Sequence, residues 1–361
     1  MRQAARPWLA PLVPIYRLVV ALRSLALRLG IERVRQLSSP VVSIGNLSTG
    51  GAGKTPLTIA MARALKERGV RVNVLSRGYG RTGKAAEKVD PLGTAERFGD
   101  EPLVIAREAG VPVYVAAQRY QAGVLAEQEN AARQDKEHEV SGHDSGRAAE
   151  GSHEGGASVP VPVIHLLDDG FQHAQLHRDV DILLVDGADL NDRLLPAGNL
   201  REPLGAVDRA TILAYTMPEA PMLEETLRRR GIWYGPVWRL HRRMQVPAID
   251  GPVVAFCGIA KPDQFFAGLE SAGLHVASRI AFADHQRYLQ HDIDCILEAA
   301  RTTKAVALVT TEKDRVRLAQ FVSALSAAQP LETAGLRVEI EEEAGHIAWL
   351  LSRVTRRAPI P

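Results

Sequence analysis

The sequence predicts an α/β protein in which a mostly parallel sheet is flanked by helices, followed by a second, smaller α/β domain. Two observations support this fold class. Apolar runs of strand length alternate with stretches of helical periodicity, which is typical of parallel sheets with crossover helices. The alternation stops after about residue 235 and then restarts. With 361 residues, 46% of them hydrophobic, the chain has enough apolar material for two cores.

The first domain is expected at residues 38–235. It begins with a strand at 40–46 and a helix at 54–69, which ends at a glycine. Its further elements are a strand at 71–78, a helix at 100–110, and strands at 111–117, 161–170, 179–187 and 210–216. Residues 127–158 are polar, glycine-rich and almost free of large apolar side chains, so we expect a disordered insertion there.

The smaller domain is expected at residues 236–343. Its elements are strands at 251–260, 275–284 and 305–314, a helix from Lys261 and a helix at 290–301. Two strand-like segments, 233–241 and 336–343, flank these elements and are expected to pair as connectors. Residues 344–361 should form a last helix that returns to the first domain.

Charge and cysteine content narrow the classes of function. The net charge of +2 and an aromatic content of 5% give little reason to bind nucleic acid, so no nucleic-acid partner is predicted. Cys257 and Cys295 are the only cysteines, which argues against a disulfide framework or a cysteine-based zinc site and fits a reducing compartment. No protein partner is predicted.

Residues 1–37 form a basic, apolar N-terminal segment with seven arginines and one acidic residue. Prolines and arginines interrupt the apolar run, so we expect neither a transmembrane span nor a cleaved signal peptide. A helix from about residue 14 would place Arg17, Arg28 and Arg35 in one row beside leucines and valines. This pattern favours an amphipathic helix on anionic lipid, and the alternative is a terminal helix packed on its own domain.

A glycine-rich segment, residues 43–57, separates the first strand from the first helix. Glycines let backbone N–H groups approach phosphate oxygens, a lysine reaches the terminal phosphates, and a threonine hydroxyl can bind Mg²⁺. The usual spacing would place its first glycine at Ser48, so this is a variant of the phosphate-binding loop, and the alternative is a structural turn. We expect a P-loop NTPase-like domain that binds nucleotide through Ser48, Thr49, Gly50, Gly51, Ala52, Gly53, Lys54 and Thr55.

The motif VIHLLDDGFQH places Asp168 and Asp169 directly after a buried strand. The carboxyl end of that strand should lie beside the phosphate-binding loop, where a carboxylate can hold Mg²⁺ directly or through water. A plain Asp-Asp-Gly turn is the alternative. The two motifs in one domain together predict a magnesium nucleotide site.

Other candidate residues have both a functional and a plain interpretation. Asp100 in GDEP could accept a proton from an attacking hydroxyl or simply begin a helix. Arg77 in SRGYGR could bind phosphate or stay in solvent, and His285 in ADHQRY could be an ordinary loop histidine. Arg201 and Glu202 in LLPAGNLREPL could form a surface ion pair.

Eight motifs, in order along the chain, closely resemble the tetraacyldisaccharide 4′-kinase family of Gram-negative lipid A biosynthesis. They are GNLSTGGAGKTP, SRGYGR, GDEP, LLDDGFQH, LLPAGNLREPL, AFCGIAKPDQFF, ADHQRY and VTTEKD. The resemblance runs from Trp8 to about residue 318, and it departs at the 127–158 insertion and in the tail. It implies transfer of the ATP γ-phosphate to the 4′-hydroxyl of tetraacyldisaccharide 1-phosphate, giving lipid IVA.

The resemblance also implies a role for each motif residue. Lys54 and Thr55 would hold phosphates and Mg²⁺, while Asp100 would be the catalytic base, supported by His285. The remaining implied residues are the metal ligands Asp169, Gln172 and Glu202, with Asp168 orienting them, and the phosphate or substrate contacts Arg77, Arg119 and Arg201. Because the substrate's acyl chains stay in the bilayer, the resemblance favours a peripheral enzyme at the cytoplasmic face of the inner membrane.

Two other functions remain open on the sequence. A membrane-associated P-loop ATPase switch often carries a lysine before the glycine pair, where this chain has Thr49. A GTP-binding regulator would need an N-K-x-D motif, and the T-E-K-D at 311–314 has its lysine in the wrong place. Phosphate on a sugar acceptor would distinguish the kinase from both.

Overall fold

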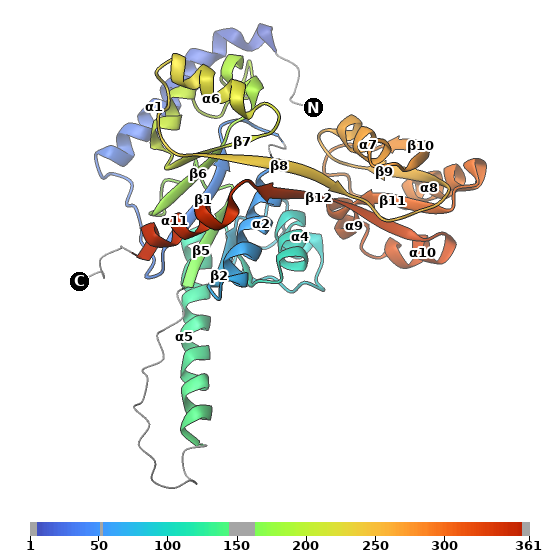
Figure 1. The fold of residues 1–361 in the computed structure, drawn as a ribbon, viewed down its shortest axis with the longest axis horizontal. Coiled ribbons are helices and arrows are strands. Elements are labelled where there is room, and N and C mark those ends of the chain that lie inside the picture. Colours follow the sequence, from blue (N-terminus) through green and yellow to red (C-terminus); the bar gives the residue numbers. More distant parts are fainter. Residues whose placement is uncertain (1–5, 51–52, 144–162, 356–361) are drawn as a thin grey trace.

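The computed structural model describes residues 6–50, 53–143 and 163–355. Within these residues, 12 strands form a sheet in the order β10-β9-β11-β12-β8-β7-β6-β1-β5-β2-β4-β3. Figure 1 shows that the sheet runs through two lobes, a larger first lobe around β1 and a smaller second lobe around β9. The predicted α/β class is confirmed, and the two units share one continuous sheet.

The first lobe is built around β1, whose six residues are all buried. Such a strand suits the centre of a parallel sheet, and β1 pairs in parallel with β5 and β6. Asp168, the last residue of β5, lies opposite Ile44, so the two strands end at the same edge. The strands of this lobe are β1 (Val41–Asn46), β2 (Arg71–Ser76), β3 (Glu87–Lys88), β4 (Val113–Val115), β5 (Val163–Asp168), β6 (Val180–Leu184) and β7 (Ile212–Thr216).

Helices cover both faces of this part of the sheet. Apolar residues of α2, α4 and α11 pack on one face, and those of α5 and α6 pack on the other. The C-terminal α11 returns from the second lobe to the first, where Ile347 and Leu350 join the same core as α2. The helices are α2 (Lys54–Glu67), α3 (Ala95–Phe98), α4 (Asp100–Ala109), α5 (Arg119–His143), η3 (Gly187–Asn191), η4 (Leu204–Arg209), α6 (Ala220–Arg229) and α11 (Glu343–Thr355).

Two long strands, β8 (Val237–Gln245) and β12 (Leu331–Ile340), connect the lobes. They include most of the two segments that the sequence indicated as connectors, and they pair antiparallel with Val338 opposite Arg242. On their outer sides, β8 pairs with β7 and β12 pairs with β11. The ladder of backbone hydrogen bonds therefore passes from one lobe to the other without a break.

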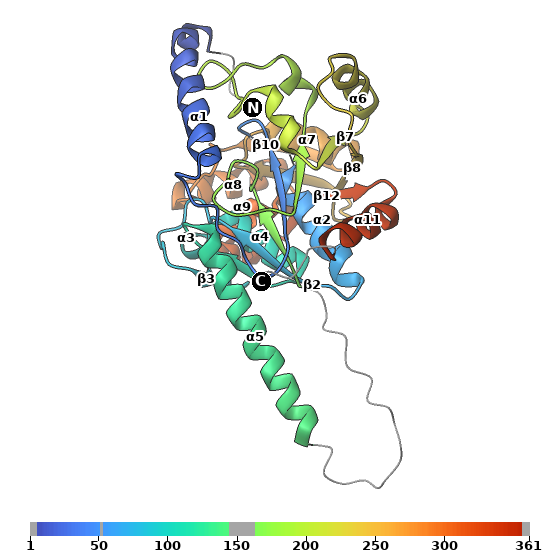
Figure 2. The same cartoon turned by 90° about the vertical axis from the view of Figure 1, so that its left-hand side faces the viewer.

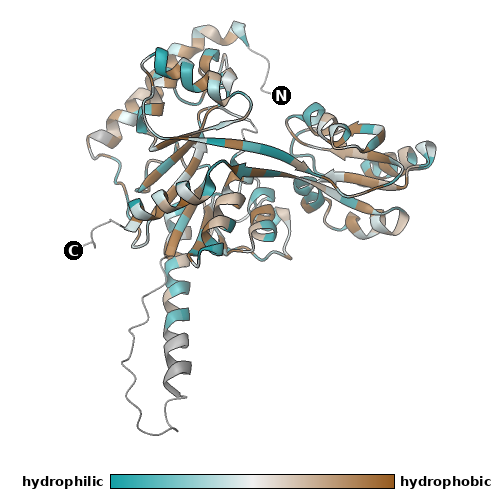
Figure 3. Ribbon diagram, in the orientation of Figure 1, coloured by the Kyte–Doolittle hydropathy of each residue, from teal (hydrophilic) through white to brown (hydrophobic). Residues whose placement is uncertain are grey.

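The second lobe is a three-stranded parallel unit added to this ladder. Phe265 and Phe266 of α7 pack on one face, while α8 and α10 pack on the other, and in Figure 3 the hydrophobic colour follows its strands. The sequence predicted a strand through residue 314, but the Thr311 hydroxyl accepts the Asp314 N–H at 3.1 Å and caps a helix instead. Its elements are β9 (Pro252–Cys257), α7 (Pro262–Ser271), β10 (His275–Ala281), α8 (Gln290–Thr303), β11 (Ala307–Thr311), α9 (Glu312–Leu318) and α10 (Phe321–Ala328).

Helix α5 corrects part of the expected disordered insertion. Residues 127–143 continue this helix, which projects from the body in Figure 2, and residues 144–158 lie outside the described residues. Glutamate, glutamine and alanine favour helix even where large apolar side chains are few. Ala126 is buried, and a carboxylate oxygen of Glu129 accepts a hydrogen bond from the Tyr114 hydroxyl at 3.0 Å, so the sheet anchors the first half of the helix.

The N-terminal segment forms η1 (Pro7–Leu12) and α1 (Val13–Arg28). Its prolines do not interrupt the helix, because Pro11 lies in the 3₁₀ turn and Pro14 lies in the first turn of α1, where no N–H partner is needed. By length and composition alone, Pro7–Leu27 is long and apolar enough to cross a membrane, whereas its prolines and arginines were expected to interrupt the apolar run. A signal sequence or a core helix can have the same composition, so this property alone does not define its environment.

Helix α1 contacts the first lobe and still leaves a large apolar surface exposed. Val13 and Tyr16 pack beside the core that contains α6, and the Tyr16 hydroxyl donates to the Arg201 carbonyl at 2.9 Å. Arg35, expected in one row with Arg17, lies beyond the end of α1. The exposed apolar residues of η1, α1 and the turn after them are Trp8, Leu12, Ile15, Leu18, Val19, Leu22, Leu25 and Leu29.

Candidate active site

The phosphate-binding loop lies between the end of β1 and the start of α2. Gly53 precedes the helix with a φ of 91°, a left-handed conformation that favours glycine. A Cβ at this position would lie 2.8 Å from the Arg242 guanidinium, the mobile end of a long side chain, so the left-handed backbone conformation is the main reason for a glycine here. The loop is held from the other side by the Thr49 N–H, which donates to the Asn199 carbonyl at 2.8 Å. Gly51 and Ala52 lie outside the described residues.

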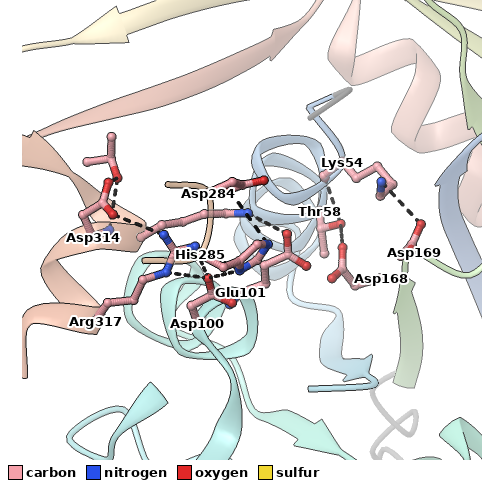
Figure 4. A network of polar contacts seen from close by, with 12 residues as sticks. Lys54, Thr58, Asp100, Glu101, Asp168, Asp169, Asp284, His285, Asp314 and Arg317 are labelled. Carbon is pink, nitrogen blue, oxygen red and sulfur yellow. Dashed lines mark hydrogen bonds and ion pairs between the residues drawn. The ribbon is translucent and has the colours of Figure 1, made fainter. Parts of the chain in front are cut away.

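Lys54 is oriented by a residue at the end of β1. Its Nζ donates to Asn46 Oδ1 at 2.9 Å and lies 3.4 Å from Asp169 Oδ1. The Asn46 amide in turn donates to the carbonyl of buried Ser48 at 2.8 Å. Figure 4 shows Lys54 at the start of its helix, pointing toward Asp169. Lys54 and the described start of the loop are thus held by hydrogen bonds within the chain.

Asp168 is a buried carboxyl group at the end of β5. Thr58, one turn after the buried Thr55 on α2, donates its hydroxyl to Asp168 Oδ1 at 3.2 Å. Burial raises the pKa of Asp168 to about 7, and the nearby carboxylates of Glu101 and Asp169 act in the same direction. Burial therefore favours the neutral form of this carboxyl group over the ionised form.

Asp169 is surrounded by cations. Arg201 Nη1 lies 3.1 Å and 3.0 Å from its two carboxylate oxygens and 3.2 Å from Gln172 Oε1. Burial alone would raise the pKa of Asp169, but Lys54 and Arg201 lower it to about 2. Its φ of 49° turns the chain sharply after the strand. Gln172 is placed by its Nε2, which donates to the Asn46 carbonyl at 2.8 Å.

The remaining predicted residues around this edge have different surroundings. Glu202 forms an ion pair with Arg209, and burial raises its pKa although the arginine opposes the shift. Arg119 begins α5, is buried, and donates through Nη2 to the carbonyls of Asp168 and Asp169 at 3.3 Å and 3.0 Å. Arg77 is exposed just after β2, close enough for its charge to lower the pKa of Arg119.

A second cluster joins the first lobe to the second. Asp100 is the first residue of α4, and its Oδ2 lies 3.3 Å from His285 Nδ1 in the loop before α8 (Figure 4). Burial favours the neutral form of Asp100, but His285, Arg317 and Lys313 outweigh it and hold the pKa of Asp100 well below its usual range. The hydrogen bond that the Asp100 carboxylate accepts raises the pKa of His285. The structure thus brings the two predicted catalytic residues together.

Sequence reasoning missed several residues that hold these groups. Asn46 lies inside a quoted motif but was given no role, and Thr58 is one helical turn beyond Thr55. Lys313 lies within VTTEKD, and its Nζ donates to Glu101 across the lobes at 2.6 Å. No sequence pattern marks these contacts, because they depend on how separate segments come together.

The donor set at the nucleotide edge fits magnesium better than a transition metal. Among the described residues, no three histidine, cysteine, aspartate or glutamate side chains gather as a preformed metal site. The predicted ligands Thr55, Asp169, Gln172 and Glu202 offer hydroxyl, carboxylate and amide oxygens, which Mg²⁺ prefers. Such a set suits an ion that arrives with nucleotide phosphates.

Comparison with known proteins identifies the family of this chain. A family model described as tetraacyldisaccharide-1-P 4′-kinase matches residues 5–355. The chain belongs to this family. Membership in the 4′-kinase family favours a kinase over the ATPase switch and the GTP-binding regulator.

Individual relatives extend over almost the whole chain. A tetraacyldisaccharide 4′-kinase from Geobacter metallireducens is 38% identical over 333 residues, which cover 88% of this chain and 90% of that protein. One from Koribacter versatilis is 33% identical over 357 residues, covering 96% and 99%. A crystal structure described as the apo form of LpxK from Aquifex aeolicus in complex with ATP is 28% identical, with a TM-score of 0.69 and coverage of 97% and 99%.

Proposed function

We propose that this 4′-kinase family member transfers the γ-phosphate of ATP to the 4′-hydroxyl of a tetraacylated glucosamine disaccharide 1-phosphate, giving lipid IVA. The observation that carries the proposal is that Asp100 and His285 from two lobes meet (Figure 4), with Asp100 on α4, which packs beside the helix that begins at Lys54. Family membership supports the reaction class. The role of each side chain is argued below from its contacts.

The nucleotide is assigned to the edge formed by β1, β5 and α2. Backbone N–H groups of residues 48–55 would surround the phosphates, and Lys54, held by Asn46, would reach the terminal ones. Thr55, Asp169, Gln172 and Glu202 would hold Mg²⁺, with Asp168 behind them. Bound there, Mg²⁺ neutralises charge on the transferred phosphate. Arg201 would move from Asp169 toward phosphate, and Arg77 and Arg119 add positive charge at this edge.

The acceptor hydroxyl is assigned to the Asp100 side of the site. A sugar hydroxyl is a poor nucleophile, so its alignment with the γ-phosphate and a nearby proton acceptor would lower the barrier. Asp100 would accept the proton. His285, whose Nδ1 lies 3.3 Å from Asp100 Oδ2, would stabilise the negative charge of the Asp100 carboxylate before the transfer. Because the two residues come from different lobes, this arrangement exists only while the lobes are in contact.

The exposed apolar surface of α1 is assigned to the membrane. Leu18, Leu22 and Leu25 of this helix stay exposed among the described residues, whereas the substrate's acyl chains require a bilayer. Arg17 and Arg23 on the same helix can attract anionic headgroups. The enzyme would rest on the cytoplasmic face of the inner membrane, where ATP is present.

The decisive experiment supplies purified protein with Mg·ATP and tetraacyldisaccharide 1-phosphate in mixed micelles. Mass spectrometry should show an acceptor heavier by one phosphate, and fragmentation should place that phosphate at the 4′-oxygen. Release of free phosphate without a phosphorylated sugar would contradict the proposal and favour an ATPase. Omitting Mg²⁺ should abolish product.

A further inference from the structure

We infer that Arg317 is a positioning residue for the phosphoryl transfer, which holds the Asp100 carboxylate ionised and correctly oriented from the opposite lobe. The inference rests on the proposed role of Asp100 as proton acceptor. It assigns a function to a residue of α9 that lies outside every motif of the sequence analysis. Four observations support it.

First, Arg317 contacts both members of the pair. Its Nε donates to Asp100 Oδ2 at 2.9 Å, and its Nη2 donates to the same oxygen. Nη2 also lies 3.2 Å from His285 Nδ1. The side chain is only 7% exposed, so water screens these contacts little.

Second, the second lobe fixes the direction of the guanidinium. Nη1 of Arg317 donates to the Gly258 carbonyl at 2.6 Å and to Asp314 Oδ1 at 3.2 Å. Asp314 is fully buried and accepts hydrogen bonds from the Tyr288 hydroxyl at 3.0 Å and the Thr311 hydroxyl at 2.6 Å. All three guanidinium nitrogens are therefore engaged, and the arginine reaches Asp100 from a rigid support.

Third, these contacts leave one carboxylate oxygen for the substrate. Arg317 and His285 both approach Oδ2 of Asp100. Among the contacts of the described residues, Oδ1 accepts only the Glu101 N–H, at 2.9 Å. A carboxylate oxygen has two lone-pair directions, so Oδ1 retains one to accept the proton of the acceptor hydroxyl. Arg317 thereby selects the reactive oxygen.

Fourth, the surrounding charges make Arg317 important for the ionisation of Asp100. The charged groups on the elements around it include Arg317, Glu312, Lys313, Asp314 and Arg315 of α9, Asp284, His285 and Arg287 of the loop before α8, Glu101 of α4, Glu96 and Arg97 of α3, and Arg63 of α2. Burial raises the pKa of Asp100, and only His285, Arg317 and Lys313 lower it substantially. Without Arg317 the pKa of Asp100 must rise.

The test compares Arg317→Met and Arg317→Lys with the wild type in the full kinase assay across pH 5 to 9. For Arg317→Met we expect kcat to fall by about 10²-fold while the KM for ATP changes by less than about threefold. The acid limb of the kcat profile, which for the wild type should lie below this range, should move up into it, because burial then raises the pKa of Asp100 and only the ionised carboxylate accepts a proton. Arg317→Lys should largely restore the position of the limb but not the maximal kcat, since an ammonium lacks the planar fork.

Arg315→Met is the matched control. Arg315 lies on α9, as Arg317 does, and its Nη1 donates to the Leu331 carbonyl at 2.8 Å, away from Asp100. Its kcat and pH profile should match the wild type. If Arg317→Met does not fold, as judged by its thermal midpoint, then Arg317→Lys decides the question, and a wild-type kcat for that variant would overturn the inference.

Asp100→Asn separates this inference from the proposed function. If Asp100→Asn keeps wild-type turnover, the role of Asp100 as proton acceptor is wrong, and the inference fails with it. If Asp100→Asn is inactive while Arg317→Met keeps both its kcat and its acid limb, the kinase mechanism stands and the inference about Arg317 alone is wrong.

Discussion

His285 Nδ1 lies 3.3 Å from Asp100 Oδ2, although the two residues belong to different lobes and 185 positions separate them. The histidine reaches this position from a loop whose backbone is itself held, because the His285 N–H donates to the Gly258 carbonyl at 3.2 Å. The Tyr79 ring lies on its other side, with ring centroids 5.7 Å apart. The centre of the proposed reaction is therefore an interface between lobes.

Lys54→Met should lower kcat by about 10³-fold, because the lysine would stabilise charge on the transferred phosphate. Steady-state kinetics with varied ATP would measure the loss, and the KM for ATP should rise as well. Lys66→Met is a suitable control on the same helix, since its Nζ only donates to the Gly110 carbonyl at the surface. Equal activity of both variants would contradict the assignment of the nucleotide edge.

Thr58→Val should impair both stability and turnover. It removes the hydroxyl that donates to buried Asp168, at a cost of about 1–3 kcal/mol in the free energy of unfolding. Thr58→Ser keeps the hydroxyl and should restore most of the loss. Urea denaturation and kcat, measured on both variants, check the prediction, and a fully stable Thr58→Val would show that this contact is dispensable.

The Lys313–Glu101 ion pair should contribute measurably to the contact between lobes. The two atoms are 2.6 Å apart and both side chains are half-buried, so a double-mutant cycle should give a coupling energy of about 1 kcal/mol. The exposed Arg229–Glu225 pair on α6 serves as the comparison, with an expected coupling of about 0.3–0.5 kcal/mol. A coupling for Lys313 and Glu101 that does not exceed the comparison would be evidence against a structural role.

Replacing residues 136–158 by a flexible linker of glycine and serine should leave kcat within about twofold of the wild type. The contacts of Glu129 with Lys88 and with the Tyr114 hydroxyl hold α5 on the sheet, and this deletion spares them. Glu129→Gln, which weakens its ion pair with Lys88, should instead lower the thermal midpoint. Loss of folding in the deletion variant would show that the removed residues stabilise the first lobe.

The double variant Leu18→Glu and Leu22→Glu should detach the protein from lipid vesicles without unfolding it. These side chains are 59% and 55% exposed, and removing their transfer free energy should weaken vesicle binding at least about tenfold. Leu92→Glu is the control, because Leu92 is 91% exposed but lies outside α1. Flotation of all three proteins with anionic vesicles gives the measurement, and undiminished binding of the double variant would place the membrane contact elsewhere.

The sequence predicted those features that depend on neighbouring residues. The succession β1, loop, α2 and the position of Asp168 at the end of β5 follow from apolar runs, glycines and strand length. The pairing of Asp100 with His285 came only from the resemblance to a family, because no local pattern connects the two residues. Arg317 was not predicted at all, since its importance depends on where the second lobe places α9.

Two errors had a common physical origin. Composition favoured disorder for residues 127–143, yet the first turns of α5 are anchored on the sheet and good helix formers extend it. Prolines were expected to interrupt the N-terminal segment, yet Pro14 lies where a helix tolerates it. In both cases the place of a residue in the fold decided its structure more than its residue type did. Pro14 lies at the start of a helix, and residues 127–143 continue a helix that is anchored on the sheet.

The hydrogen bond from Tyr16 to the Arg201 carbonyl ties α1 to the loop that also sends a side chain to Asp169. Near the start of η1, the Arg6 N–H donates to the Ala197 carbonyl of the same loop at 2.9 Å. If α1 rests on the bilayer as proposed, this attachment sets the height of the reaction centre above the lipid headgroups. The acceptor would then be selected by how far its hydroxyl protrudes from the membrane, in addition to its chemical identity.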